Sequence, residues 1–545
     1  MKQVLSKFKN VAAAWLPLSA FAAFAGLLAM TLVRAHLRET PYILGEWNRV
    51  YYLLWALLAL MILSVLKDRR LASAAFGLLV VMAVCIIFGE MNLSRVDECC
   101  HLDYICYVAK MHRLPKMTQL INTQRIMRTG AIGGLTAGRR YEAVQVPLYY
   151  LLMSVPAMLI RNMRALLYFC RLAGLGMWCG AICLYRKILL KLHSEGLLKD
   201  YPTAFCLLCL FGMNPGVLIR CIFVSNEPLT ILLTAGALYV TVQILLYGYS
   251  LRRAAAGTLL CICLFYTKST GVFVIGGLWL VLLYRRRLGI CILSAAAYAA
   301  SAVPWFLRSL RLYGSFTGMN EHINLVINNI NPMQLPINPY TEIFCIFIKK
   351  YFIPADVEFP GTFAVYINIA VSVLVICLLA VCILRELLRL FRYLAGKWRF
   401  CYSTEEKRDY LLMISAALAM ANISMLAISS VSTLLDTLIG RYLYFLILPL
   451  SVLFTDLTER YRQRIFCAGI TAVVLSVLFL DTFTWYAASI GGQHGWFEPE
   501  YEHVLYEQME TNAGRVQKIV MKQMTEEWIS AFDAGAGEEA DTNNG

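Results

Sequence analysis

The chain is dominated by runs of about twenty apolar residues that carry almost no charge, the length that a helix needs to cross a membrane. Hydrophobic residues make up 59% of the 545 positions, and charged residues make up only 15%. Soluble domains carry about 25% charged residues and shorter apolar runs. The sequence therefore predicts an all-α polytopic membrane protein and excludes a soluble enzyme.

We expect about thirteen transmembrane helices, which two long polar intervals divide into groups. The expected spans lie near 11–33, 50–66, 71–89, 166–186, 201–223, 227–247, 254–268, 270–284, 288–306, 362–384, 410–432, 440–456 and 464–486. The first two form an N-terminal extension over 1–70, and the others form a transmembrane domain over 71–486. Residues 487–545 form an acidic C-terminal segment, whose composition predicts disorder from about residue 534.

The formal net charge of +15 is concentrated in short basic clusters between the apolar runs, such as KDRR at 67–70 and RYRQR at 460–464. Basic loops of this kind mark the cytoplasmic side of a membrane protein. With a cytoplasmic N-terminus, all strong basic clusters fall on that side of the plasma membrane. The intervals 90–165 and 307–361 and the C-terminal segment are then extracytoplasmic. Nucleic acid is not an expected partner, because no basic stripe is interleaved with aromatic residues.

The apolar run at 146–160 is too short for an ordinary span, and Pro147 and Pro156 bracket it. If it crossed the membrane, the basic segment 186–193 would move to the outer side, against the rest of the charge pattern. We therefore expect a helix that lies along the outer membrane surface, within a large first extracytoplasmic loop.

Three ionisable residues, Asp97, Glu98 and His101, follow the third apolar run within SRVDECCHLDYICYVAKMHRLP. If 96–112 is helical, their spacing directs all three side chains toward roughly one face. Ionisable groups at a membrane boundary are costly, so they indicate a functional site. The alternative is a set of solvated interface residues. A carboxylate placed here can take a proton from a hydroxyl nucleophile.

A metal site is a second interpretation of this segment, because Glu-x-x-His pairs hold metal in di-iron helix bundles. Those sites need a second such pair, and the sequence of the expected transmembrane domain over 71–486 contains none besides Glu98 and His101. The sequence therefore assigns no metal ligands, although a divalent ion as a cofactor is left open.

Lys268, Arg308 and Arg441 lie at the ends of expected spans on the outer side, where basic residues are not the rule. Cations there invite an anionic ligand, and they can stabilise the charge that builds on a departing phosphate. Because a phosphate group can leave without being protonated, transfer from it needs a general base but no general acid. This combination points to glycosyl transfer from a lipid-linked phospho-sugar. Other polar candidates in the same outer regions are Glu142, Gln145, Arg220, Asn226, Glu227 and Tyr442.

Six short motifs in order resemble the GT-C superfamily of membrane glycosyltransferases, in the bacterial branch of protein O-mannosyltransferase-like and aminoarabinose-transferase-like enzymes. They are Asp97-Glu98…His101…Leu114-Pro115, QVPLYY at 145–150, Ser225-Asn226-Glu227, Thr267-Lys268…Gly271, Pro304-Trp305-Phe306…Arg308…Tyr313-Gly314 and Gly440-Arg441-Tyr442. They cover roughly 71–450. Val146 replaces a usual proline, and Glu227 stands where Asp is commoner.

The resemblance implies a GT-C-like helix bundle that acts on a polyprenyl-phosphate-linked sugar at the extracytoplasmic face. It implies inverting transfer to a hydroxyl of a glycan, lipid or protein acceptor, with Asp97 as general base and Glu98 beside it. Lys268, Arg308 and Arg441 would bind the lipid phosphate. The remaining candidates for substrate binding are His101, Glu142, Gln145, Arg220, Asn226, Glu227 and Tyr442.

Two alternatives remain at this point. A transporter or flippase of a lipid-linked or envelope substrate would carry ionisable residues at mid-membrane and broken helices in paired repeats. A non-catalytic scaffold of a cell-envelope complex would retain only a degenerate site.

Overall fold

The computed structural model describes residues 69–89, 98–119, 140–318, 351–352, 362–395, 402–433, 440–461 and 463–491. This part of the chain is helical, with turns between the helices and no strand, which confirms the all-α expectation. Asp97 and the expected spans at 11–33 and 50–66 lie outside the described residues.

Six described helices are long and apolar enough to cross a membrane, and a bent pair would make a seventh span. They cover Ala165–Ser194, Glu227–Tyr247, Leu288–Tyr313, Tyr366–Arg392, Thr404–Ser429 and Gly440–Tyr461, with the bent pair at Tyr201–Gly212 and Pro215–Ile222. These helices indicate an integral membrane protein. The expected count of thirteen is not confirmed within the described residues.

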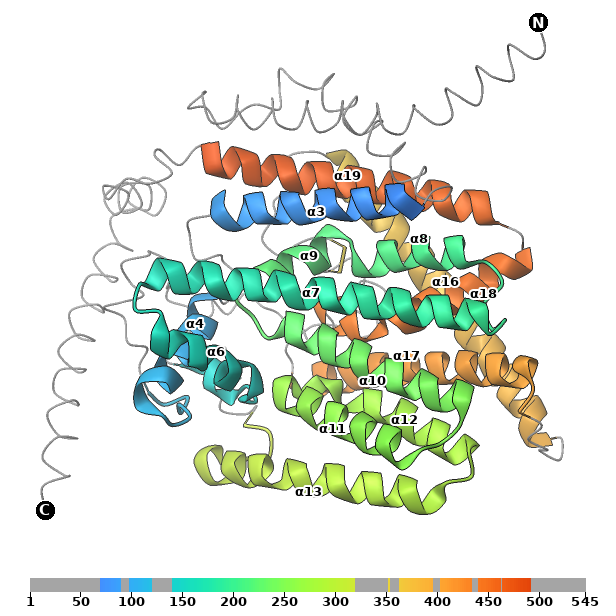
Figure 1. The fold of residues 1–545 in the computed structure, drawn as a ribbon, viewed down its shortest axis with the longest axis horizontal. Helices are drawn as coiled ribbons and strands as arrows, with labels where there is room; N and C mark the ends of the chain where they lie inside the picture. Colours follow the sequence, from blue (N-terminus) through green and yellow to red (C-terminus); the bar gives the residue numbers. More distant parts are fainter. Residues whose placement is uncertain are drawn as a thin grey trace, which may run out of the picture. The chain divides into compact units, whose positions relative to one another are not determined.

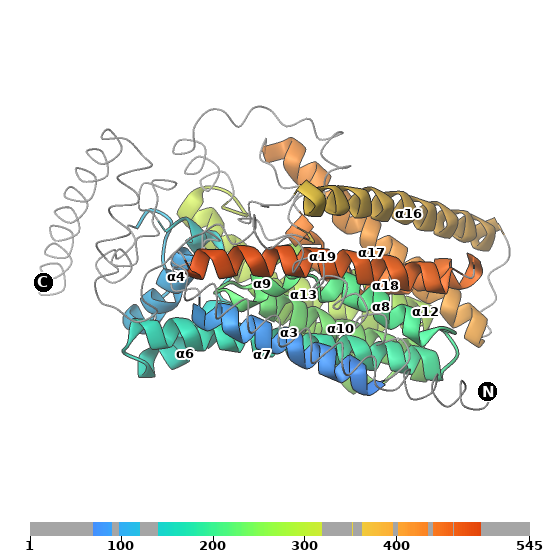
Figure 2. The same ribbon diagram turned by 90° about the horizontal axis from the view of Figure 1, so that it is seen from above.

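The chain forms two compact units, and the first contains the described residues of 1–89, 171–303 and 336–492. Its long helices run roughly alongside one another, and α16 passes obliquely behind them (Figure 1; Figure 2 shows the view from above). Its elements are α3 (Arg69–Gly89), most of α7 (Met163–Ser194), α8 (Tyr201–Gly212), α9 (Pro215–Ile222), α10 (Glu227–Tyr247), α11 (Leu251–Thr267), η4 (Ser269–Val272), α12 (Phe273–Tyr284), α13 (Leu288–Tyr313) as far as Val303, α16 (Thr362–Ala395), α17 (Thr404–Thr433), η5 (Gly440–Leu446), α18 (Ile447–Tyr461) and α19 (Arg464–Gly491).

The first unit is held together by two sets of packed helices. Helix α10 packs on α11 and α12, while α18 packs on α8 and α17, and α19 packs on α8 and α16. Leu208, Phe211, Leu450 and Leu453 are almost completely buried where α8 meets its neighbours. Because lipid is as apolar as these side chains, close packing rather than exclusion of water stabilises such contacts within a membrane.

The expected span over 201–223 is not one helix, because α8 and α9 meet at an angle of 55°. Asn214 ends one helix and begins the next. Its Nδ2 donates to the carbonyl oxygens of Leu210 at 2.9 Å and Phe211 at 3.2 Å, and its Oδ1 accepts from the Val217 amide at 3.1 Å. Pro215 then occupies the first turn of α9, where a missing N–H costs nothing. The Asn-Pro pair therefore explains the break.

Neighbouring side chains satisfy the other polar backbone groups that the break exposes. Trp178 of α7 donates to the Gly212 carbonyl at 3.0 Å, Tyr351 to the Phe211 carbonyl at 3.2 Å, and Tyr444 of η5 to the Gly216 carbonyl at 3.0 Å. Irregular backbone at membrane depth is tolerated only when protein or water satisfies it in this way.

The second unit contains α4 (Glu98–Met111), η3 (Tyr141–Val144), α6 (Leu148–Leu159), the start of α7 and the end of α13. The sequence predicted a helix over 96–112, and α4 occupies most of that range. Helix α4 packs on α6 and η3, with the rings of Tyr104 and Tyr150 stacked at a centroid distance of 3.8 Å.

Helix α6 has twelve residues, which is too short to cross a membrane. It buries Tyr149 and Tyr150 within the second unit and exposes apolar side chains, including Val155 and Leu159, on its other side. This length and exposed apolar face are what a helix along a membrane surface requires. Its position against a membrane stays a prediction.

Candidate functional site

Two of the predicted site residues, Lys268 and Glu227, form a buried ion pair in the first unit. Lys268 follows the last residue of α11, and Glu227 is the first residue of α10. The Lys268 Nζ lies 2.6 Å from the Glu227 Oε1, and both residues are buried. A buried ion pair of this kind is held in a defined geometry, because separating its members would leave a charge without compensation.

Two further cations act on the same carboxylate. Arg220 on α9 is buried, and Arg441 on η5 is half-buried. Both guanidinium groups interact electrostatically with Glu227. Four separate segments of the first unit therefore direct three cationic side chains and one carboxylate toward one place.

Tyr442 contributes the aromatic part of this arrangement. Its ring centroid lies 4.9 Å from the Lys268 Nζ and 5.1 Å from the Arg441 Cζ. Arg441 also donates a hydrogen bond to the Tyr442 hydroxyl at 3.2 Å. Cations over an aromatic face are stabilised by its quadrupole. We call Arg220, Glu227, Lys268, Arg441 and Tyr442 the cation cluster.

Asn226 and Gly271 hold the segments that carry the cluster. The Asn226 side chain donates to the Thr267 carbonyl at 3.1 Å, which ties the start of α10 to the end of α11. At Gly271, a Cβ atom would lie 2.7 Å from the Leu264 Cγ and 3.1 Å from the Phe445 ring. Only glycine fits there without displacing a neighbour. The motif residues around Lys268 thus position its side chain.

The second unit gathers a different set of predicted residues around the contact between α4 and α6. Glu98 is fully buried at the start of α4. The His101 Nδ1 lies 2.7 Å from the Tyr150 hydroxyl, and the two rings stack. We call Glu98, His101, Tyr104, Glu142 and Tyr150 the acidic–aromatic group.

Tyr104 lies at the centre of this group and donates to the Gln145 carbonyl at 3.4 Å. Burial raises the pKa of its phenol above the ordinary value, and the charges of Arg308 and Glu142 act on it in opposite directions. The phenol therefore stays neutral and able to donate a hydrogen bond. Arg308 itself donates to the Pro115 carbonyl at 2.6 Å and lies over the Trp305 ring.

The second unit also contains an ion pair between Asp103 and Arg140, neither of which was predicted as a site residue. The Arg140 Nε donates to the Asp103 Oδ2 at 2.7 Å, and both side chains are buried. The Arg140 Cζ also lies 4.5 Å from the centroid of the Tyr107 ring. No pattern in the sequence joins residues 37 positions apart, so only the folded chain reveals this pair.

A second charged site was also overlooked, this time in the first unit. Asp456 of α18 is completely buried. It forms an ion pair with Arg385 at 2.7 Å and accepts hydrogen bonds from Arg408 at 2.6 Å and from Arg460 at 3.0 Å. Further ion pairs extend from these arginines. We call the whole set the arginine network: Arg385, Arg389, Arg408 and Arg460 with Glu386, Asp409, Asp456 and Glu459.

The predicted site residues therefore fall into two gathered sets. Arg220, Asn226, Glu227, Lys268, Arg441 and Tyr442 come together in the first unit, and Glu98, His101, Glu142, Gln145 and Arg308 belong to the second. Within the part of the chain that the structure describes, no three histidine, cysteine or acidic side chains gather as a metal site.

Comparison with known proteins identifies no family for this chain. The chain matches no protein-family model, no curated protein and no solved structure. Its function must therefore be inferred from the geometry and chemistry of its own residues.

Proposed function

We propose that this protein is an integral membrane glycosyltransferase that moves a sugar from a polyprenyl-phosphate donor to an acceptor hydroxyl on the extracytoplasmic side, with inversion. The observation that supports this proposal is the cation cluster. It gathers buried and half-buried cations near the first residues of Glu227–Tyr247 and Gly440–Tyr461, two helices that are long and apolar enough to span a membrane. A ligand that is both lipid and phosphate suits such a place.

The cation cluster supplies the stabilisation that the leaving group needs. As the bond from the anomeric carbon to the phosphate oxygen breaks, negative charge grows on the phosphate, and the cations of Arg220, Lys268 and Arg441 offset it. Arginine adds paired N–H donors that match phosphate oxygens. Glu227 would hold Lys268 in place through their 2.6 Å contact. Arg308 is assigned to the phosphate from the sequence pattern alone.

Asp97 is the proposed general base, which takes the proton from the acceptor hydroxyl as that oxygen attacks the anomeric carbon. Glu98 beside it is fully buried at the start of α4, which suits support of the base rather than direct contact with a substrate. His101, Glu142 and Gln145 are proposed to bind the sugar or the acceptor. The resemblance to GT-C enzymes of bacterial plasma membranes supports these assignments.

The test is the variant Asp97→Asn, assayed for transfer of radiolabelled sugar from polyprenyl-phosphate donors extracted from labelled bacterial membranes. Removing a general base lowers the rate by roughly a hundredfold to ten-thousandfold. The variant should enter the membrane and elute from a sizing column like the wild type. Glu195→Gln, at an exposed position in the first unit, is the matched control and should keep full activity. Normal transfer by Asp97→Asn would contradict the assignment.

A transporter or flippase is the second candidate, and the break between α8 and α9 favours it, because interrupted spans line the substrate sites of many transporters. Vesicles that contain the purified protein and a fluorescent polyprenyl-phosphate sugar would distinguish the two functions. Movement of the lipid between leaflets with no new glycosidic bond would favour transport. A new bond that depends on Asp97 would favour transfer.

A further inference from the structure

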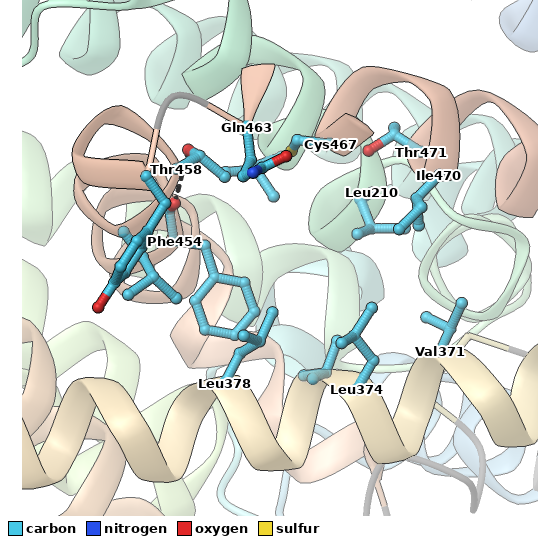
Figure 3. A pocket seen from close by; sticks show the side chains of 14 residues that line it. Leu210, Val371, Leu374, Leu378, Phe454, Thr458, Gln463, Cys467, Ile470 and Thr471 are labelled. Carbon is cyan, nitrogen blue, oxygen red and sulfur yellow. Dashed lines mark hydrogen bonds between the residues drawn. The ribbon is translucent and has the colours of Figure 1, made fainter. Parts of the chain in front are cut away.

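The first unit contains an apolar groove among α8, α16, α18 and α19 (Figure 3). Val371, Leu374 and Leu378 of α16 lie in a row along it, and none of the described residues that line it is charged. Such a surface gives van der Waals contact to any hydrocarbon chain and selects none. The exposed charges of the second unit are more selective, because they all have the same sign.

The described part of the second unit separates its charges by burial. Its acidic side chains are all buried, whereas five of its basic side chains are exposed. The acidic residues are Glu98, Asp103 and Glu142, and the exposed basic residues are Lys110, Arg113, Lys116, Arg161 and Arg311. As far as the structure describes this unit, the charge on its surface is therefore entirely positive.

The sequence around these cations shows the same imbalance. Residues 104–141 contain seven lysines and arginines and no aspartate or glutamate. This interval is expected on the extracytoplasmic side, where basic residues are not the rule. The preference of cations for cytoplasmic loops therefore does not explain them.

Four of the exposed cations lie on two segments of the second unit. Lys110, Arg113 and Lys116 follow one another at intervals of three residues, at the end of α4 and in the segment after it. Arg311 lies in the last turn of α13. We call these four residues the basic patch.

Hydrogen bonds on both sides of Lys116 join the two segments. Arg308 of α13 donates to the Pro115 carbonyl at 2.6 Å. The Met117 amide donates to the Tyr313 hydroxyl at 3.2 Å, and the Tyr313 ring packs against Met117. The chain that carries Lys116 is therefore fixed beside the end of α13 that carries Arg311.

The surroundings of the basic patch indicate water rather than lipid. Six side chains are exposed among residues 110–119, and Met111 is the only apolar one of the six. On α6, in the same unit, every exposed side chain is apolar. The surface of this unit that suits lipid is therefore on α6, and the basic patch suits a ligand that approaches from water.

The exposure of the patch favours a polymer over a small anion. Exposed cations remain hydrated, and a single exposed ion pair contributes little to binding. A chain with many negative charges contacts several cations at once and releases counterions at each contact, so its affinity grows with the number of contacts.

We propose that the basic patch binds a linear polymer of the cell envelope that carries phosphate or carboxylate groups along its length. The binding itself requires no glycosyl transfer. If the proposed function is correct, this polymer is the acceptor, and that identification alone rests on the proposed function.

The binding test uses the full chain in phosphatidylcholine nanodiscs and follows the fluorescence anisotropy of labelled long-chain polyphosphate, poly-L-glutamate and neutral dextran. We expect at least one of the two polyanions to bind, with an affinity that falls as salt increases, and dextran not to bind. The polyanion that binds more tightly identifies phosphate or carboxylate as the preferred group. Failure of both polyanions to bind, or equal binding of dextran, would refute the proposal.

The triple variant Lys110→Gln, Arg113→Gln and Lys116→Gln removes three cations from the patch. It should weaken polyanion binding about tenfold or more at low salt, because three contacts are lost. The slope of log affinity against log salt should become shallower by about 2, or about 0.7 for each lost contact. If this variant does not fold, Lys116→Glu takes its place, and an unchanged affinity in that variant would refute the proposal.

The matched control is the triple variant Lys187→Gln, Arg252→Gln and Arg287→Gln. It removes the same charge from exposed positions of the first unit. Its affinity and salt slope should stay those of the wild type. Equal losses in the two triple variants would show that net charge, rather than the basic patch, binds the polymer.

Lys110 and Lys116 also report where the polymer binds. A water-soluble amine-reactive ester labels exposed lysines, and mass spectrometry measures the label on each. Polyphosphate or polyglutamate, whichever binds, should remove most of the label from these two lysines and leave Lys187 labelled, and unchanged labelling of all three would place the binding elsewhere. Nanodiscs that contain anionic phosphatidylglycerol should not protect the two lysines without a polymer. Protection by that lipid would identify the membrane surface as the partner and overturn the proposal.

Discussion

The cation cluster and the arginine network belong to the same unit and differ in their balance of charge. In the arginine network, four arginines meet four carboxylates, and Asp456 alone forms ion pairs with three of the arginines. In the cation cluster, three cations gather about one carboxylate, Glu227. The central carboxylate of each, Asp456 and Glu227, is buried.

This difference indicates two separate roles. Ion pairs whose charges balance within the protein hold helices together. Removing one member of such a pair leaves the other charge buried without compensation. Cations that gather in excess around one carboxylate suit a ligand that brings negative charge of its own. Mutations in the arginine network should therefore lower the stability of the protein, and mutations in the cation cluster should weaken ligand binding.

The largest effect is expected for Asp456→Ala, which leaves the half-buried Arg385 and Arg408 and the exposed Arg460 without their shared carboxylate. Breaking a buried pair costs about 3–5 kcal/mol of unfolding free energy. Thermal unfolding in detergent, followed by size-exclusion chromatography, should show a large fall in Tm and little folded protein. Glu195→Gln should keep the wild-type Tm, and an unchanged Tm for Asp456→Ala would contradict the structural role.

The next effect is expected for Arg441→Gln in the cation cluster. A hydrogen bond to a charged group contributes about 1.5–3 kcal/mol, or roughly ten- to hundredfold in affinity. The KM for the polyprenyl-phosphate donor should rise by that factor, and the rise in Tm that polyprenyl phosphate causes in the wild type should vanish. Arg252→Gln, which removes an exposed arginine at the start of α11, is the matched control. A large loss of Tm without ligand would instead place Arg441 among the structural residues.

A smaller effect is expected for Tyr442→Leu, which removes the ring between Lys268 and Arg441. A cation–π contact is worth about 0.5–2 kcal/mol, which corresponds to roughly a two- to thirtyfold weaker binding of polyprenyl phosphate. Tyr442→Phe keeps the ring and loses only the hydroxyl, so its affinity should stay close to that of the wild type. Equal losses in the two variants would show that the hydroxyl, rather than the ring, matters.

The smallest effect is expected for Arg460→Gln. Its side chain is 47% exposed, although it contacts the fully buried Asp456 at 3.0 Å. Pairs exposed to this extent contribute less than about 1 kcal/mol. Thermal unfolding should therefore separate Arg460→Gln clearly from Asp456→Ala, and a comparable loss of Tm would mean that the network depends equally on all its members.

The sequence predicted the class of the molecule and several members of its clusters. Apolar runs specify membrane helices because length and lack of charge are local properties. Lys268 and Glu227 could both be selected as ionisable residues at the ends of such runs. Their contact could not be predicted, because it joins residues 41 positions apart and depends on how α10 packs against α11.

Other features were missed for different reasons. The break at Asn214 carried a local signal, an N-cap residue followed by proline, but apolar residues on both sides suggested a single span. Asp456 was expected merely to end a span, because its three arginine partners lie on α16, α17 and α18. Asp103 and Arg140 carried no signal at all.

The hydrogen bonds at the break between α8 and α9 include one from a tryptophan, whose fluorescence depends on its surroundings. Tyr444, which donates to the Gly216 carbonyl, follows Arg441 and Tyr442 in the short helix η5, and the Trp178 indole donates to the Gly212 carbonyl. We expect a ligand that shifts η5 to change the hydrogen bonds on both sides of this break, including the one that Trp178 donates. The intrinsic emission of that indole, isolated by replacing the other tryptophans, would follow occupancy of the cation cluster without any added dye.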